Sequence, residues 1–327
     1  MSRVFESPDG PPGPARIIDL YCGYMISQTL FAAVETGLFA AAGPEPATPA
    51  QLAERCDIPE RSARAMADLL ADAGLLERDG AAFRTAPDAE AFLTGRGPAD
   101  LRPMARYWAT VSYPAWGNAI EAFRTRRGVR PVLNKAQTEA YESTVALVTA
   151  ETAADLARTY DFGRNRRLLD VGGGYGTFAR PILSAYENLS VTLIDLPEVA
   201  AAVAGQAIPR LTAIGADIFE SPLPAGHDVI LVANLVHLLP PDRITELFRR
   251  LRAAATPEAT LLLVDWWRTD RAPHPSARYG AGEFLIISGG DLYQVDEVAG
   301  WLTETGWKFT GLTELPPPSG LLVAVPD

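Results

Sequence analysis

The sequence has few of the residues that mark several well-known classes of protein. Its 327 residues include only two cysteines, Cys22 and Cys56, which are too few and too isolated for a disulfide framework or a thiolate metal site. Two such thiols suit a reducing compartment. The three histidines, His227, His237 and His274, have no spacing typical of a chelating pair, so we expect no bound metal.

Basic charge is also scarce, because the formal net charge is −11 at pH 7. This excess of acid disfavours nucleic acid and anionic membranes as main partners. No apolar run approaches the roughly 18–20 residues of a membrane span, and Met1–Glu6 lacks the apolar segment of a secretory signal. With 48% hydrophobic residues, the chain is predicted to be a cytoplasmic globular protein of one large domain or two.

The first hundred residues predict a mainly α-helical domain. Residues 1–15 are rich in proline, glycine and acids and indicate a loose arm, after which helical periodicity runs from Ala15 to about Ala42. Two short helices are predicted to begin near Thr48 and Pro59, and Leu75–Thr85 has the pattern of a small β-hairpin. Helix, turn, helix and hairpin together predict a winged-helix unit.

Many winged helices bind DNA, but this one is predicted to serve packing and dimerisation. Residues 1–100 hold eight Arg, no Lys and fifteen acidic residues, whereas a DNA reader needs a basic surface. The first helix carries more apolar surface than one winged helix needs to bury, with Leu20, Met25, Leu30 and Phe31, so we expect a homodimer. A cofactor-sensing winged-helix regulator is the alternative from another functional class.

Residues 101–160 are predicted to form a helical linker that is rich in aromatic side chains. Aromatic residues at helical spacing usually belong to a core. The alternative is that some of these rings cover a flat apolar substrate. Trp108, Tyr113 and Trp116 are the candidates for that contact.

Residues 161–327 alternate between strand and helix patterns, which predicts an α/β domain with a doubly wound parallel sheet. The strand candidates are Leu168–Gly172, Val191–Asp195, Leu211–Asp217, Asp228–Asn234 and Thr260–Asp265. The helix candidates between them are Thr177–Glu187, Pro197–Ala207 and Pro241–Ala255. Two late apolar runs, Trp307–Thr313 and Gly320–Val325, predict a terminal antiparallel pair.

A glycine-rich turn after the first of these strands is the main functional signal. Gly172, Gly174 and Gly176 allow sharp turns and close approach of the backbone to a ligand. Their spacing is not that of dinucleotide folds, and no Gly-Lys-Ser/Thr follows to hold phosphates. Asp195 ends the second strand, 25 residues beyond Asp170, where a parallel sheet would direct it at a ribose. Together these residues predict a nucleoside-type site.

From about residue 15 to its end, the chain resembles the class I S-adenosylmethionine-dependent methyltransferases, in particular the homodimeric small-molecule O-methyltransferases with an N-terminal winged-helix dimerisation domain. That resemblance implies a Rossmann-like, seven-stranded sheet. The segment from Asp170 to Gly176 looks like the motif around the methionine part of the cofactor, and Asp195-Leu196 like the grip on the ribose hydroxyls. Gly215–Phe219 looks like the adenine cap: Asp217 would accept from the exocyclic amine, Ile218 would lie beside it, and Phe219 would pack on the ring. Asn234 is a further cofactor candidate.

The same resemblance implies that His237 is the general base. A phenol with a pKa near ~10 is mostly protonated at neutral pH, and an imidazole with a pKa near ~6.5 can take its proton as the methyl group transfers. Asp265 lies 28 residues further on, at the end of the next strand, where the family commonly has a carboxylate that orients the histidine. Both side chains are predicted to lie at the carboxyl ends of adjacent strands.

The sequence departs from the family pattern in two places near this pair. His237 is followed by Leu238-Leu239-Pro240-Pro241, where the family usually has an acid and a tryptophan. The position expected to hold a second carboxylate is Leu292, with Asp291 beside it, and Tyr293 stands where the family has arginine. Asp291 and Phe284 complete the predicted substrate contacts.

The predicted function is therefore methyl transfer to a hydroxyl of a small, aromatic, natural-product-type molecule. C- or N-methylation, or a non-methylating reaction on the same fold, are the alternatives.

Overall fold

The computed structural model describes residues 14–97, 99–269 and 274–327. Their contacts divide the chain into two units: one holds the residues up to Tyr113 together with Leu133–Thr144, and the other holds Pro114–Val132 and Val145–Asp327. The domain boundaries proposed at residues 100 and 160 remain a prediction. In the structure, the residues of the predicted linker, 101–160, are divided between the two units. The arm expected over residues 1–15 falls almost entirely outside the described residues.

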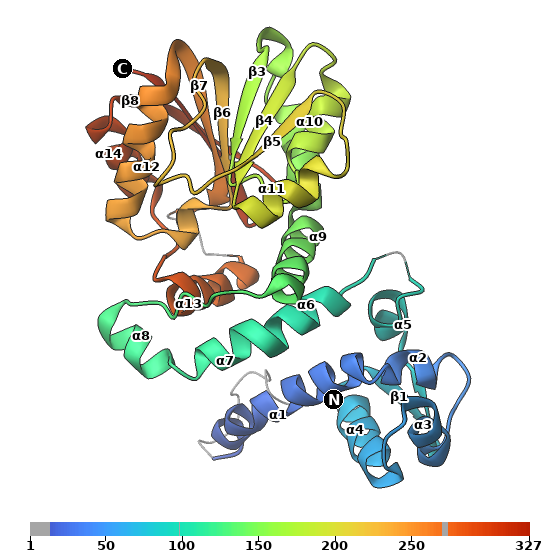
Figure 1. Cartoon of the computed structure of the whole chain (residues 1–327). Helices are drawn as coiled ribbons and strands as arrows, with labels where there is room; N and C mark the ends of the chain where they lie inside the picture. The colour runs from blue at the N-terminus through green and yellow to red at the C-terminus, as the bar shows by residue number, and fades with distance from the viewer. Residues whose placement is uncertain (1–13, 98, 270–273) are drawn as a thin grey trace. The chain divides into compact units, whose positions relative to one another are not determined.

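The first unit is mainly helical and contains the predicted winged helix (Figure 1). Its elements are α1 (Ala15–Glu35), α2 (Leu38–Ala42), α3 (Pro49–Cys56), α4 (Glu60–Asp72), β1 (Leu76–Asp79), β2 (Ala82–Thr85), α5 (Pro87–Leu93), α6 (Arg102–Tyr107) and the π-helical turn η2 (Trp108–Ser112). Helix α3 begins as predicted, with a capping box in which Thr48 and Gln51 satisfy each other's backbone N–H groups. Strands β1 and β2 form the antiparallel wing.

Helix α1 carries apolar side chains that the described residues leave exposed. Its exposed side chains include Ile17, Ile18, Leu20, Tyr21, Tyr24 and Met25. Leu30 and Phe31, expected on the same exposed face, instead pack on the winged-helix core. By length and composition α1 also passes the test for a membrane-spanning helix, with a mean hydropathy of 1.4. The helix passes on its average composition, although polar residues such as Asp19 and Gln28 interrupt its apolar run.

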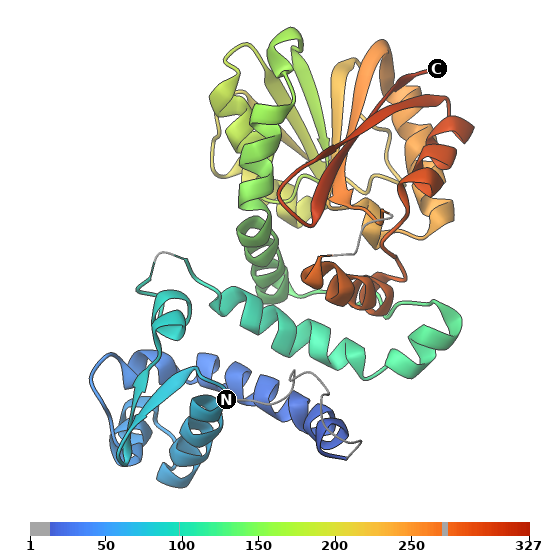
Figure 2. The same ribbon diagram turned by 180° about the vertical axis from the view of Figure 1, so that it is seen from behind.

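The second unit is built on a seven-stranded sheet with the order β5-β4-β3-β6-β7-β9-β8. Its strands are β3 (Arg167–Val171), β4 (Ser190–Asp195), β5 (Leu211–Gly215), β6 (His227–Ala233), β7 (Ala255–Trp266), β8 (Trp307–Glu314) and β9 (Ser319–Pro326). The first five are parallel, while β9 pairs antiparallel with both β7 and β8 at one edge (Figure 2). The predicted doubly wound sheet and its terminal antiparallel pair are confirmed.

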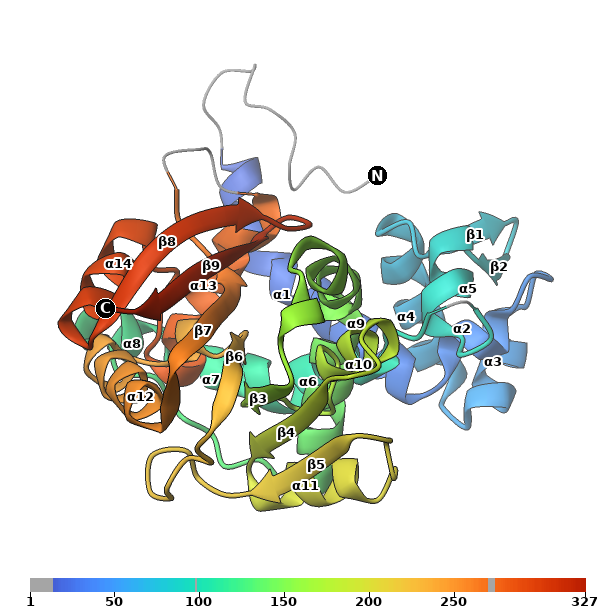
Figure 3. The ribbon, with the colours of Figure 1, turned by 90° about the horizontal axis from the view of Figure 1, so that it is seen from above.

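Helices cover both faces of this sheet (Figure 3). The helical elements of this unit are α8 (Ala119–Thr125), η3 (Phe162–Arg164), α10 (Ala179–Ala185), α11 (Pro197–Ala204), η4 (Val236–Leu238), α12 (Pro241–Ala254), α13 (Pro275–Ser288) and α14 (Val295–Glu304). Two further helices, α7 (Tyr113–Trp116) and α9 (Lys135–Thr159), have residues in both units. The end of α9 and α10 pack on one face through a core that includes Leu156, Phe162 and Ile182. Helices α12 and α14 pack on the other, around Phe248 and Trp307.

The predicted ends of two strands need correction. Strand β5 ends at Gly215 rather than Asp217, because residues 216–219 leave the sheet in a turn that the Asp217 carboxylate caps. Strand β7 begins at Ala255, five residues before the predicted Thr260, because Ala255 pairs with His227 of β6; an irregular stretch that includes Pro257 separates this pair from the regular pairing that starts at Thr260. Helices α13 and α14 were not assigned from the sequence.

The strand order sets the position of the site. From β3 the chain runs outward through β4 to β5 and then returns to place β6 on the other side of β3. In parallel α/β sheets, ligands bind outside the carboxyl ends of the strands at such a reversal. The glycine turn follows β3 and Asn234 follows β6, so both lie at this edge. A Cβ on Gly172 would come within 3.2 Å of the Leu235 side chain, which shows how closely the two loops pack.

Candidate active site

The glycine turn after β3 has the backbone conformation that its sequence demands. Gly172, Gly174 and Gly176 all have positive φ angles, of 69°, 53° and 75°, which other residues rarely adopt. Gly173 has a different reason to be glycine, since a Cβ there would lie 2.7 Å from the Asp170 Oδ2 atom. The turn therefore presents bare backbone at the sheet edge, where a ligand can approach closely.

Asp195, at the end of β4, reaches this turn as predicted. Its Oδ2 accepts a hydrogen bond from the Gly174 N–H at 2.8 Å, and its Oδ1 accepts one from the Leu196 N–H at 2.7 Å. Burial raises the pKa of Asp195, and these two hydrogen bonds act in the opposite direction. A carboxylate oxygen that accepts one hydrogen bond retains a further acceptor site, so Asp195 can still receive hydroxyl groups.

Asp170 lies on strand β3, just before the glycine turn, and its carboxyl group has unusual surroundings. It is buried, and neither carboxyl oxygen has a hydrogen-bond partner among the described residues. Burial, followed by the nearby Asp195 carboxylate, raises its pKa to about 7. Buried polar groups without partners are rare in folded proteins, so this carboxyl group is a candidate for a ligand contact.

Residues 217–219, which are predicted to contact the adenine, form a turn after β5. The exposed Asp217 accepts a hydrogen bond from the Phe219 N–H at 2.8 Å, while Ile218 and Phe219 pack on the sheet core. The guanidinium of Arg243, on α12, lies 3.6 Å from the centre of the Phe219 ring. No sequence pattern pointed to Arg243, and the stacking of Phe219 on adenine remains a prediction.

His237 and Asp265 are brought together as predicted. His237 lies in η4 just after β6, Asp265 lies near the end of β7, and the His237 Nδ1 atom is 2.5 Å from the Asp265 Oδ1 atom. The Asp265 Oδ2 atom also accepts from the His237 backbone N–H at 3.2 Å, and Oδ1 accepts from the Trp266 N–H at 2.7 Å. A proton on Nδ1 leaves the Nε2 lone pair available, so the imidazole can accept a proton there.

Aromatic rings enclose the His237 imidazole. The ring of Phe284, on α13, stacks on it with centres 3.8 Å apart and planes at 25°, and Trp266 lies against both rings. Gly280 makes room for this arrangement, because a Cβ there would lie 2.5 Å from the Trp266 ring. Phe284, expected among the substrate contacts, thus contacts the imidazole, and its contact with substrate remains a prediction.

Asp291 does not replace the missing second carboxylate at the imidazole. Its Oδ2 atom pairs with Arg126 at 2.8 Å, and its Oδ1 atom lies 3.7 Å from the Arg268 guanidinium. Leu292 is buried, and the Tyr293 hydroxyl donates to the Leu239 carbonyl at 2.6 Å. Of the two candidate acids, only Asp265 is hydrogen-bonded to the histidine, and the substrate role of Asp291 remains a prediction.

The three candidate aromatic residues fall in different units. Trp108 and Tyr113 belong to the first unit, and Trp116 belongs to the second. The Trp116 indole N–H donates to the Glu283 Oε2 atom at 2.7 Å, and its ring lies over Gly282 of α13. Trp116 is therefore fixed on the helix that also carries Phe284. No sequence pattern indicated Glu283, and the contact of all three rings with substrate remains a prediction.

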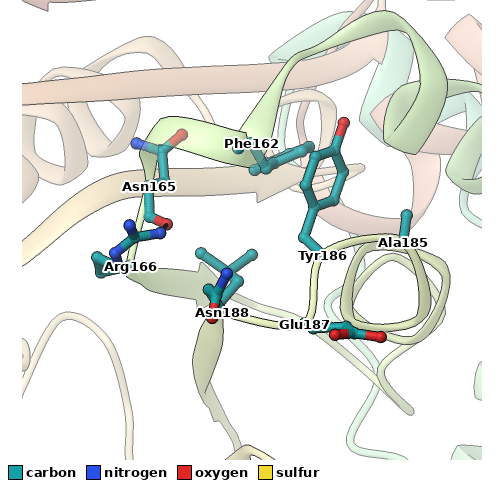
Figure 4. Close-up of a pocket in the computed structure, with 9 residues that line it drawn as sticks. Phe162, Asn165, Arg166, Ala185, Tyr186, Glu187 and Asn188 are labelled. Atoms are coloured by element: carbon teal, nitrogen blue, oxygen red, sulfur yellow. Dashed lines mark hydrogen bonds between the residues drawn. The ribbon is translucent and has the colours of Figure 1, made fainter.

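A separate hollow lies at the amino ends of β3 and β4, away from the glycine turn (Figure 4). Its volume is about 260 Å³, and residues just before β3 and just before β4 line it, among them Asn165, Arg166 and Asn188. The hydroxyl of Tyr186, another lining residue, lies within hydrogen-bond distance of the carbonyl oxygen atoms of Ala157 and Tyr160 and can donate to either. Ligands of parallel sheets bind at the carboxyl ends of strands, so we assign no role in catalysis to this hollow.

Comparison with known proteins links this geometry to a family. Residues 115–308 match the family model of the O-methyltransferase domain, and residues 18–95 match that of the O-methyltransferase dimerisation domain. The chain is 29% identical to the 3-hydroxy-5-methyl-1-naphthoate 3-O-methyltransferase of Streptomyces sahachiroi, over 92% of this chain and 91% of that protein. It is also 29% identical to the tetracenomycin polyketide synthesis 8-O-methyltransferase of Streptomyces glaucescens, over 95% and 96%.

Solved structures agree in fold. The structure of human N-acetylserotonin methyltransferase in complex with S-adenosylmethionine superposes with a TM-score of 0.84, covering 98% of this chain and all of that chain at 20% identity. The mainly helical N-terminal region and the seven-stranded sheet predicted from the sequence are therefore those of known O-methyltransferase structures.

Proposed function

Because the chain belongs to the O-methyltransferase family and uses S-adenosylmethionine, we propose that it methylates a hydroxyl of a small aromatic molecule with His237 as the general base. The observation that carries this proposal is the buried pair formed by His237 and Asp265 at the carboxyl ends of β6 and β7. Relatives that act on a hydroxynaphthoate and in tetracenomycin polyketide synthesis support an aromatic acceptor of natural-product type.

The turn after β3 fits the cofactor. It offers bare backbone where a Cβ on Gly172 or Gly173 would meet a neighbouring side chain, and Asp170 offers two carboxyl oxygen atoms without partners. Asp195 would hold the ribose hydroxyls, with Asp217 and Ile218 at the adenine. When bound, the cofactor supplies a methyl group on a positively charged sulfur, which is a strong methyl donor.

The chain's own contribution to the reaction is to move a proton and to align the acceptor. His237 takes the hydroxyl proton at Nε2, and Asp265 holds Nδ1 protonated and stabilises the imidazolium that results. Phe284 and Trp266 exclude water from the imidazole and fix its plane. The fixed imidazole then orients the acceptor hydroxyl that is hydrogen-bonded to it. The step balances as follows: the acceptor oxygen would gain the methyl group as the methyl–sulfur bond breaks, the sulfur would leave as a neutral thioether, and the hydroxyl proton would go to His237 Nε2, which becomes positively charged.

The proposed chemistry is tested with cofactor that carries a ¹³C-labelled methyl group. Hydroxylated fused-ring aromatic acids are compared with matched analogues in which the hydroxyl is replaced by hydrogen or by an amine. We expect label only in the products of the hydroxylated compounds, bonded to oxygen in the NMR spectrum. Label on nitrogen or on a ring carbon would contradict the proposal.

Replacing Asp265 by asparagine is expected to reduce turnover by about 10- to 100-fold, as is usual for a group that orients a functional histidine. The amide cannot stabilise the imidazolium, and its NH₂ group opposes the N–H donors of His237 and Trp266. Steady-state rates at saturating substrate measure this loss. A loss larger than that of His237→Ala would show that Asp265 does more than orient the histidine.

We further propose that the protein is a homodimer whose interface includes the exposed apolar residues of α1, within the segment that matches the dimerisation domain. The double variant Leu20→Glu/Met25→Glu should sediment as a monomer at micromolar concentration, because association would bury two unpaired carboxylates. The exposed Glu304→Lys on α14 serves as the control and should remain dimeric. A monomeric wild-type protein in the same experiment would contradict the proposal.

A further inference from the structure

Asp170 occupies a position in which a carboxylate ordinarily has partners. Its side chain is 1% exposed, and neither oxygen accepts a hydrogen bond among the described residues. Its neighbours in register on β4 and β6 are the apolar Leu193 and Leu231. The carboxyl group lies against the glycine turn, since a Cβ on Gly173 would come within 2.7 Å of Oδ2. These buried acceptor atoms without partners thus lie beneath the turn that fits the cofactor.

Among the residues that the structure describes, no cation acts on Asp170. Asp195, from the end of β4, is the charged group whose field acts on it among the described residues. Glu198 of α11 contributes to raising the pKa of Asp195. The guanidinium of Arg180, on α10, donates to the Tyr175 carbonyl and the Gln206 side chain rather than to Asp170. Burial and Asp195 together raise the pKa of Asp170 to about 7. In the free protein near neutral pH, this carboxyl group is therefore substantially protonated.

We propose that Asp170 gives up this proton to solvent when it pairs with the α-ammonium group of the cofactor, so that cofactor binding releases one proton. The O–H bond of the carboxyl group breaks, the ammonium group keeps its protons, and the resulting carboxylate gains a cation that none of the described residues supplies. An ion pair in a buried site favours the ionised form of the carboxyl group. This inference concerns cofactor binding alone and does not depend on His237 or on the acceptor.

The expected pH dependence follows from the direction of the change. Below about pH 7 the free protein holds the proton, and binding has to expel it. Affinity should therefore fall by about tenfold for each pH unit well below that value, and should level off above it. The α-amino group of the ligand stays mostly protonated below about pH 7.7, so the range from pH 5.5 to 7.5 isolates the carboxyl group.

Isothermal titration calorimetry with S-adenosylhomocysteine tests the proposal, because this product retains the α-ammonium group and undergoes no turnover. The observed heat is measured at pH 6.0 and 7.5 in two buffers that differ in ionisation enthalpy, and the difference counts the protons released. We expect the wild-type protein to release close to one proton at pH 6.0 and clearly less at pH 7.5.

Two variants locate the source of the proton. Asp170→Asn should release none and should bind with an affinity that is nearly flat with pH, whereas the matched control Asp88→Asn, at an exposed carboxyl group on α5, should release protons as the wild type does. Equal heats of binding for the wild type in both buffers at pH 6.0 would overturn the proposal, whether or not the variants fold. Undiminished release by a folded Asp170→Asn protein would also overturn it, and would assign the proton to another group such as Asp195.

Discussion

Turnover is expected to fall by about 10²–10⁴-fold when His237 is replaced by alanine, because the acceptor hydroxyl then loses its general base. The imidazole lies within an enclosed group of rings, with Nδ1 held by Asp265 and Nε2 left to accept a proton. Alanine removes the acceptor atom and leaves the cofactor residues at β3 and β4 in place. The measurement is a single-turnover rate at saturating substrate, with the affinity for S-adenosylhomocysteine measured in parallel.

The accompanying results distinguish a base from a structural histidine. Cofactor affinity should stay within a few-fold of the wild type, and the loss of rate should shrink as the pH rises toward the pKa of the acceptor, because solvent then shares the deprotonation. His237→Gln is the matched control, since it keeps polar bulk in the site and cannot take the proton. If His237→Ala abolished cofactor binding, the histidine would be structural.

Replacing Asp195 by alanine is expected to weaken cofactor binding by about 10- to 150-fold for each charge-assisted hydrogen bond that is lost, which corresponds to about 1.5–3 kcal/mol. Asp195 would grip the ribose hydroxyls, and it also holds the Gly174 and Leu196 N–H groups at the edge of the site. Alanine removes both functions. Calorimetry with S-adenosylhomocysteine measures the affinity.

Asp195→Asn is the matched variant for this prediction. Asparagine keeps the shape and one acceptor oxygen, so its loss of affinity should be smaller than that of alanine. A circular dichroism spectrum and a melting temperature close to those of the wild type establish that each variant is folded. Unchanged affinity in folded Asp195→Ala protein would remove this residue from the cofactor site.

Much of the second unit could be predicted because its strands are buried on both faces. Such strands appear in a sequence as short, continuous apolar runs, as in Val229–Ala233 and Leu261–Val264, and strand-helix alternation then predicts the parallel order. That order carries the site with it. Asp195 ends one buried strand, His237 follows another and Asp265 lies near the end of a third, so topology brings them to one edge.

The missed features depend on contacts between distant segments. The start of β7 contains Pro257 and Glu258, which favour a loop locally and lie in an irregular stretch; only the distant pair of Ala255 with His227 of β6 places the start of the strand before them. Leu30 and Phe31 have the same apolar character as the exposed half of α1, and only the packed winged helix distinguishes them. Helical periodicity shows that a face is apolar, but not which partner covers it.

The same limit applies to the surroundings of the proposed base. The stacking of Phe284 on His237 depends on the placement of α13, which requires Gly280 beneath the Trp266 ring. Arg243 on Phe219 likewise joins α12 to the turn after β5. These pairs have no local sequence signature. The second carboxylate expected by resemblance is replaced by the buried Leu292, which leaves Asp265 as the carboxylate bonded to the imidazole.

The central claim, that His237 deprotonates the acceptor hydroxyl, is tested most directly by the ratio of single-turnover rates of the wild type and His237→Ala across a graded series of acceptors. The series consists of one accepted hydroxyaromatic scaffold whose ring substituents progressively lower the pKa of the hydroxyl. We predict that the ratio is largest for the least acidic hydroxyl and falls steadily as the acceptor ionises without help. A ratio that stays constant across the series would contradict the account.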